Sequence, residues 1–142
     1  MKRIVFEQAG QSNIQIVSPV TDDDATLAFV IEQSVKPNTD KWFVVDDADI
    51  PSDRYFRNAW KISNGKVSVD IEKAKSIKLQ EIRLKRNSAL DASDKEIAKL
   101  TDQGADLTEM RAKRQALRDI PQTIKLDGLT PEELKSLDPI NG

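Results

Sequence analysis

The sequence predicts an α+β protein in which a small antiparallel β head precedes a charged helical tail or αα-hairpin. Three observations predict this class. Short β-branched and aromatic segments separated by turn residues fill residues 1–69, and one pair of them flanks an Asn-Gly dipeptide. Lys, Arg, Glu, Gln, Ala and Leu, which favour helices, dominate residues 70–121. Residues 122–142 are predicted to form a linker and a short C-terminal helix.

The first half of the head is expected to form a hairpin and a short helix. Residues 2–6 and 13–17 carry apolar side chains on either side of a turn, which predicts two antiparallel strands. The run of hydroxyl and carboxylate side chains at 21–24 offers helix N-caps. A helix is therefore predicted to follow to about Val35, and Pro37 closes it.

The second half of the head is expected to add one strand and one hairpin. Residues 41–45 are aromatic and β-branched, which predicts a buried strand. Residues 56–62 and 66–69 flank Asn64-Gly65, a dipeptide that favours a type I′ turn because both central residues need positive φ. The aromatic residues expected in the head core are Trp42, Tyr55, Phe56 and Trp60, with surface exposure as the alternative for Tyr55 beside Arg54.

The tail is expected to contain three helices that can fold back as an αα-hairpin. Ser93 with Glu96 matches a capping box, so a break is predicted near residues 91–93. Gly104 is expected to end the second helix in the left-handed conformation, and Pro121 to end the third. A last short helix is predicted to begin with Thr130 as cap and Pro131 at its first position, and to run to about Leu137.

Composition excludes several classes of chemistry. The chain has no cysteine and no histidine, so disulfides, thiol catalysis and His/Cys zinc sites cannot form. The net charge of −2 favours neither a nucleic-acid nor a membrane partner, and no apolar run approaches the roughly 20 residues of a membrane span. No long apolar segment follows the basic N-terminus, so we expect no secretory signal and a cytoplasmic compartment.

Two acidic clusters are candidate cation sites, because carboxylates are the ligands that calcium and magnesium prefer. They are Asp22, Asp23 and Asp24, and Asp46, Asp47 and Asp49. Their spacing does not match an EF-hand loop, so a helix cap and an exposed loop are favoured and no metal site is predicted. No nucleophile elbow or phosphate loop occurs. We therefore expect a non-enzymatic interaction protein without a cofactor.

Basic residues of the tail are interleaved with acidic ones, and no aromatic residue follows Ile71. Single-stranded nucleic acid cannot stack there, and the pattern is typical of a solvated helix face with ion pairs. The aliphatic residues at helical spacing, which include Leu79 and Ile82, can instead pack within the tail, against the head, or against another chain. This thin apolar seam favours a helix that completes its burial against a partner.

Four segments resemble small proteins encoded in the tail gene clusters of tailed bacteriophages. Residues 1–6 and 45–60 read MKRIVF and VDDADIPSDRYFRNAW. Residues 83–90 and 114–121 read RLKRNSAL and RQALRDIP, which is similar to the C-terminal region of the phage tail assembly chaperone-like, tail fibre-associated family. That family usually has an aromatic residue in the spacer between the last two segments, whereas residues 92–106 here have none.

The resemblance implies a protein that binds a tail fibre or tail-tip protein as a structural component of the virion tail. The alternative is a transient tail-fibre assembly chaperone that acts in the host cytoplasm and is absent from the mature particle. Self-association as a dimer or trimer is also possible. The apolar seam and these segments together predict the partner contacts, which are Leu79, Ile82, Arg86, Leu117 and Arg118 in the tail and Arg54, Tyr55 and Arg57 in the head.

Overall fold

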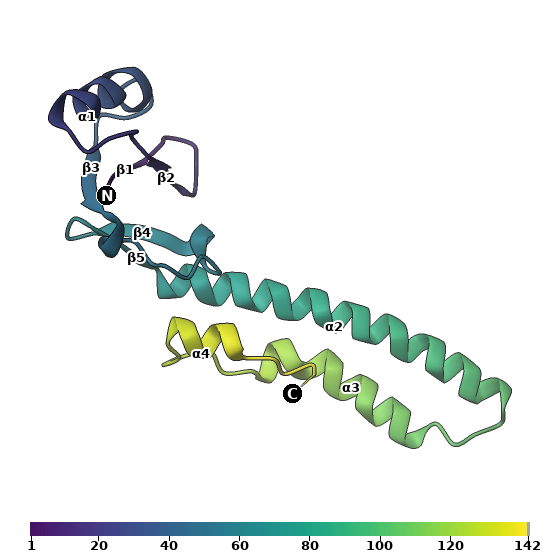
Figure 1. Cartoon of the computed structure of the whole chain (residues 1–142). Coiled ribbons are helices and arrows are strands. Elements are labelled where there is room, and N and C mark those ends of the chain that lie inside the picture. The colour runs from purple at the N-terminus through teal and green to yellow at the C-terminus, as the bar shows by residue number, and fades with distance from the viewer. Residues whose placement is uncertain (142) are drawn as a thin grey trace. The chain divides into compact units, whose positions relative to one another are not determined.

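The computed structural model describes residues 1–141 and confirms the α+β class, with small antiparallel sheets followed by a long helix (Figure 1). The chain divides into two compact units, Met1–Ala74 and Lys75–Gly142. The boundary lies one turn inside the long helix that begins at Ile71. We call the first unit the head and the second the helical unit.

The centre of the head is an antiparallel sheet in the order β2-β1-β3. Strand β1 (Lys2–Glu7) pairs with β2 (Ile14–Val17) on one side and with β3 (Trp42–Asp46) on the other. The predicted first hairpin is therefore confirmed. In this register Val5 lies opposite Ile16 and Phe43. Side chains alternate along β1, so Val5 faces one side of the sheet while Ile4 and Phe6 face the other.

Strand β3 lies at the edge of this sheet, so the prediction that it is a buried strand was wrong. Phe43 and Val44 are each 44% exposed, and Val45 is the one β3 residue that is buried. The reason is topological: β1 occupies the centre, and an edge strand has a neighbour on one side only.

Helix α1 (Asp24–Val30) begins where the acidic run predicted. Asp23 is its N-cap, and its Oδ1 accepts a hydrogen bond of 2.8 Å from the backbone N–H of Thr26. The helix continues into a π-helical segment, Ile31–Val35, before the chain turns at Pro37. Hydrogen bonds from the Thr21 hydroxyl, and then from the backbone and hydroxyl of Thr26, lower the pKa of Asp23 from 3.8 to about 2.

The second hairpin consists of β4 (Trp60–Ser63) and β5 (Lys66–Val69). Asn64 and Gly65 have φ angles of 54° and 72°, which confirms the left-handed turn that the dipeptide predicted. Residues 56–59 are not part of the strand, contrary to expectation. They form a 3₁₀ turn, Arg57–Ala59, in which the Ala59 N–H donates to the Phe56 carbonyl at 2.8 Å.

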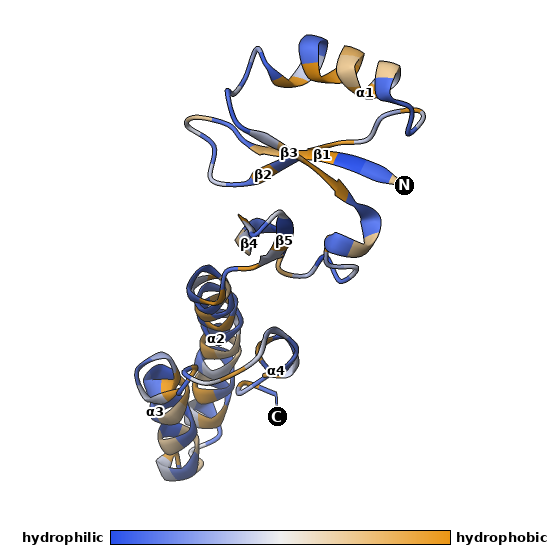
Figure 2. Cartoon of the chain, turned by 90° about the vertical axis from the view of Figure 1, so that its left-hand side faces the viewer, coloured by the Kyte–Doolittle hydropathy of each residue, from blue (hydrophilic) through white to orange (hydrophobic). Residues whose placement is uncertain are grey.

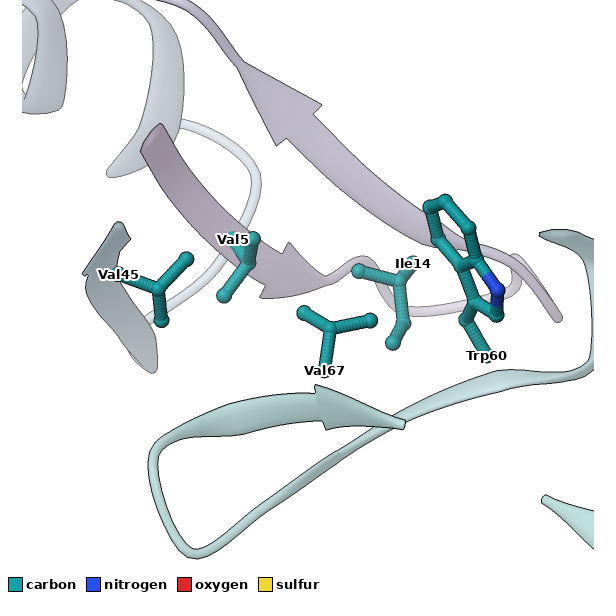
Figure 3. Close-up of a cluster of buried hydrophobic side chains, with 5 residues drawn as sticks. All are labelled: Val5, Ile14, Val45, Trp60 and Val67. Atoms are coloured by element: carbon teal, nitrogen blue, oxygen red, sulfur yellow. The ribbon is translucent and has the colours of Figure 1, made fainter. Parts of the chain in front are cut away.

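Two apolar clusters place these elements in three layers. On one side of the sheet Ile4 and Phe6 pack with Leu27 and Val35 of the helical segment. On the other side the second hairpin covers the sheet (Figure 2). The residues of this second cluster are drawn in Figure 3 and are Val5, Ile14, Val45, Trp60 and Val67. A second 3₁₀ turn, Asp47–Asp49, follows β3.

Helix α2 (Ile71–Asp102) is continuous, so the predicted break near residues 91–93 was wrong. Ser93 is 4% exposed, and its hydroxyl donates to the Leu90 carbonyl at 2.7 Å. The Ser93 hydroxyl therefore hydrogen-bonds to a carbonyl of the preceding turn instead of capping the start of a new helix. Gly104 has a φ of 67° and follows the end of the helix, as predicted.

Helix α3 (Thr108–Thr123) runs past Pro121, so the prediction that this proline ends the helix was wrong. Proline has no N–H to donate to the carbonyl four residues earlier, but only two residues of α3 follow Pro121. The Thr123 hydroxyl and the Ile124 N–H then donate to the carbonyls of Asp119 and Ile120 at 3.1 and 2.9 Å. The last turn is thereby closed.

Helix α4 (Pro131–Ser136) has the predicted start. The Thr130 hydroxyl accepts from the Glu133 N–H at 3.2 Å, and the Glu133 carboxylate accepts from the Thr130 N–H at 3.4 Å. This reciprocal pair is a capping box, and Pro131 occupies the first helical position. Leu134 of this helix is fully buried.

The cap of α1 predicts an acid-sensitive head. Because folding lowers the pKa of Asp23, its contribution is present above pH 3.8 and is lost as the pH falls to about 2. Asp23→Asn keeps an N-cap but does not titrate. We expect denaturant midpoints, followed by fluorescence of the two tryptophans in the head, to fall less between pH 4 and pH 2 in Asp23→Asn than in the native protein. Asp24→Asn is the matched control, and equal losses in all three proteins would contradict this role.

Candidate partner-binding surfaces

The three predicted head contacts lie together, in the loop and 3₁₀ turn that lead into β4. Arg54 and Arg57 flank the indole of Trp60, with guanidinium carbons 6.0 and 5.5 Å from the ring centroid. These are cation–π distances. Tyr55 is 38% exposed and packs edge-on against Phe56, with ring centroids 4.7 Å apart. The predicted core aromatics therefore divide: Phe56 and Trp60 are buried, whereas Trp42 is half-buried and Tyr55 is exposed.

Arg3 completes a group of three arginines around this site, and the sequence analysis did not single it out. It lines the same cavity as Arg54 and Arg57. The alternation of side chains along a strand could have indicated it, because Arg3 lies two residues before Val5 and therefore on the same face of β1. What the sequence could not show is which segment covers that face.

The acidic clusters serve the structure of the head. Asp23 caps α1, and Asp47 accepts a 2.7 Å hydrogen bond from Arg3 Nε while its other oxygen lies 3.8 Å from the N-terminal ammonium. Asp49 lies 3.6 Å from the Lys66 ammonium. Within residues 1–141 no group of three or more carboxylates is placed to hold a metal ion.

In the helical unit the first predicted contact group lies along α2. Ile82 is 2% exposed, while Leu79 and Arg86 are half-buried. The guanidinium of Arg86 donates to the side-chain oxygen of the adjacent Asn87 at 3.1 Å. The neighbouring Leu84, by contrast, is 60% exposed on the opposite side of the helix.

The segment around α4 packs beside this part of α2, and polar contacts tie the two together (Figure 1). The Lys78 ammonium donates to the Lys135 carbonyl at 3.2 Å, although Lys78 itself is 2% exposed. The Lys75 ammonium lies 2.9 Å from Asp127, and its hydrogen bond and charge lower the pKa of that carboxyl. The seam at Ile82 is therefore covered within the helical unit itself.

A third contact of this kind joins Lys85 of α2 to Asp138, with a separation of 3.9 Å. Hydrogen bonds from Asn141 are the larger cause of the lowered pKa of Asp138, and Lys85 adds to it. At the start of α3, hydrogen bonds from the backbone and hydroxyl of Thr108 lower the pKa of Asp106. The carboxylates of Asp106, Asp127 and Asp138 thus each accept hydrogen bonds close to an end of α3 or α4.

The second predicted contact group lies on α3, which runs antiparallel to α2 (Figure 1). Leu117 is half-buried and Arg118 is exposed. Arg114 of α3 pairs with Asp94 of α2. In this register Leu117 lies near Leu90. Leu117 is therefore about one turn of α2 from Arg86 and two turns from Ile82.

No helix within residues 1–141 is long and apolar enough to cross a membrane. Comparisons with known protein families, with curated proteins and with solved structures found no match to this chain.

The burial of Ile82 predicts that its truncation weakens the helical unit itself. Ile82→Ala removes buried apolar volume, so we expect a loss of roughly 2–4 kcal/mol of stability. Leu84→Ala is the control, since it truncates a neighbouring aliphatic residue that is 60% exposed and should change stability by about 0.5 kcal/mol or less. Helical circular dichroism follows the unfolding. Equal effects of the two substitutions would contradict the packing of α4 on α2.

Proposed function

We propose that this chain is a non-enzymatic protein of the bacteriophage tail that binds a tail-fibre or tail-tip protein as a structural component of the virion. The observation that carries the binding role is the unequal burial of the two units. Of the fourteen buried hydrophobic side chains in residues 1–141, twelve lie in Met1–Ala74. The helical unit contributes Ile82 and Leu134 alone.

The apolar face of α3 is where burial is least complete. This helix has no buried residue. The larger apolar residues of α3 and those just outside its ends are all half-buried, and they are Leu107, Met110, Leu117, Ile120, Pro121 and Ile124. Helical stability in proteins comes mainly from packing an amphipathic face. A partner that covers this face would therefore stabilise α3 more than its own chain does.

The assignment to a phage tail rests on the four segments that resemble tail-cluster proteins. Two of them coincide with the candidate surfaces. Residues 45–60 include the loop that carries Arg54 and Arg57, and residues 114–121 lie on α3. Two of the four segments on which the resemblance rests therefore carry side chains that we propose for partner binding.

The alternative is a transient assembly chaperone that is absent from the mature particle. The half-buried α3 face also favours this function, because a chaperone must release its client and a thin seam permits release. A structural subunit would instead keep the face covered in the finished tail. Mass spectrometry of purified particles separates the two functions, since a structural subunit is retained in fixed stoichiometry and a chaperone is lost.

Co-expression tests the binding role directly. The tagged chain, produced with tail-fibre and tail-tip proteins of the same genome, is expected to co-purify with one of them. Arg118 is exposed on α3, so Arg118→Glu should weaken binding roughly tenfold if the contact is charge-assisted. Lys61→Glu, a charge reversal at an exposed position of β4, is the control. Failure of every tail protein to co-purify, with the chain folded, would contradict the proposed function.

A further inference from the structure

The head contains a cavity of about 420 Å³ between the arginine-bearing loop and the sheet. This volume lies within the range of ligand-binding pockets. Its polar and charged lining consists of Arg3, Ser18, Asp47, Ser52, Arg54 and Arg57. Its remaining wall is apolar and is formed by Ile16, Ile50, Pro51 and Trp60.

Two buried donors that belong to residues lining this cavity have no acceptor among residues 1–141. They are Nη1 of Arg57 and Nε1 of Trp60. Trp60 is 2% exposed, and Figure 3 shows its indole nitrogen on the side of the ring that faces away from Ile14. Buried polar groups are nearly always hydrogen-bonded in folded proteins. A ligand acceptor that displaced the side chains now covering these two atoms would satisfy them.

The net positive charge of the cavity lining also favours an anionic ligand. Three of its lining residues are arginines and one is an aspartate. The aspartate, Asp47, is already engaged by Arg3 Nε at 2.7 Å and by the N-terminal ammonium at 3.8 Å. Within residues 1–141 no carboxylate forms an ion pair with Arg54 or Arg57. Two arginines without a carboxylate partner among the described residues therefore line this cavity.

We propose that this cavity binds a carboxylate on an acidic segment of a partner protein. A guanidinium fork matches the two oxygens of a carboxylate, which favours this ligand over a single-oxygen acceptor. The apolar wall formed by Ile16, Ile50 and Pro51 suits the carbon stem of such a group. Only the assignment to a partner protein rests on the proposed function; the carboxylate chemistry follows from the cavity.

The test is a titration of the ¹⁵N-labelled full chain with short peptides. The probe is an acetylated, amidated peptide with two glutamates, and its twin has glutamines instead. The observable is the indole N–H resonance of Trp60. The indole of Trp42 is an internal control, because Trp42 packs with the cluster on the opposite face of the sheet, and Trp42→Phe assigns the two signals. We expect a saturable shift of the Trp60 signal with the glutamate peptide and none with its twin.

Variants test which side chains bind. Arg57→Gln and Arg54→Gln should each weaken the apparent affinity roughly tenfold, the effect of losing one charge-assisted hydrogen bond. Arg54 is exposed, so its variant keeps the test usable if Arg57→Gln does not fold. Arg83→Gln, which removes an exposed arginine from α2, is the matched control and should bind as the native chain does.

Two further titrations distinguish between sources of the carboxylate and between carboxylate and phosphate as the anion that binds. A third peptide, with a free C-terminus and no acidic side chain, tests whether a C-terminal carboxylate binds. A saturable Trp60 shift with the glutamate peptide or with this third peptide supports the proposal. Equal shifts with the glutamate peptide and its glutamine twin, or tighter binding of inorganic phosphate, would overturn it. The titration needs no tail protein, so its failure is distinguishable from a failure of the co-expression experiment.

Discussion

The head depends on the burial of β1. This strand has neighbours on both sides, and its alternating side chains supply both apolar clusters. Ile4 and Val5 are fully buried on opposite faces, and Phe6 is 3% exposed. Because β1 is the central strand of the middle layer, its side chains contact both the helical segment on one face of the sheet and the second hairpin on the other.

The helical unit is organised differently, and this contrast underlies its proposed function. Helix α2 has 32 residues, yet the buried residues along its part of the helical unit are Lys78, Ile82 and Ser93. Two of these three are polar. Lys78 needs the Lys135 carbonyl as an acceptor, and Ser93 needs the Leu90 carbonyl. Polar groups at the seam lower the apolar area that packing can bury, and so the stability gained from it.

The same contrast separates the two candidate surfaces. In the head the arginines are set on a packed core, so the cavity beside Trp60 is held by elements that do not depend on a partner. On α3 the side chains are held mainly by their own helix and by the pair of Arg114 with Asp94. The first surface suits recognition of a defined chemical group, and the second suits a contact that orders the protein as it binds.

Local signals in the sequence predicted local structure well. Asn64-Gly65, Asp23 and Thr130-Pro131 each act within a few residues, and each forms the turn or cap expected. The failures came where packing outweighed a local signal. The capping-box pattern at Ser93 did not start a helix, because α2 continues through this residue and the Ser93 hydroxyl donates to the Leu90 carbonyl of the preceding turn.

The site was predictable to the same extent. Arg54, Tyr55 and Arg57 were predicted together because they lie in one segment, residues 45–60, that resembles tail-cluster proteins. Arg3 was missed, because its place beside them depends on how β1 pairs with strands distant in the sequence. The cover of Ile82 by α4 was missed for a related reason. Thr130-Pro131 predicts that a helix begins, but not the surface against which Leu134 packs.

The most direct test of the account is hydrogen–deuterium exchange of the isolated full chain. Opening free energies follow the packing that local unfolding removes. We expect backbone amides of α3 to exchange at least about a hundred times faster than those of β1, because α3 has no buried residue and β1 is the centre of the core. Protection of α3 equal to that of β1 would contradict the claim that the helical unit needs a partner to complete its burial.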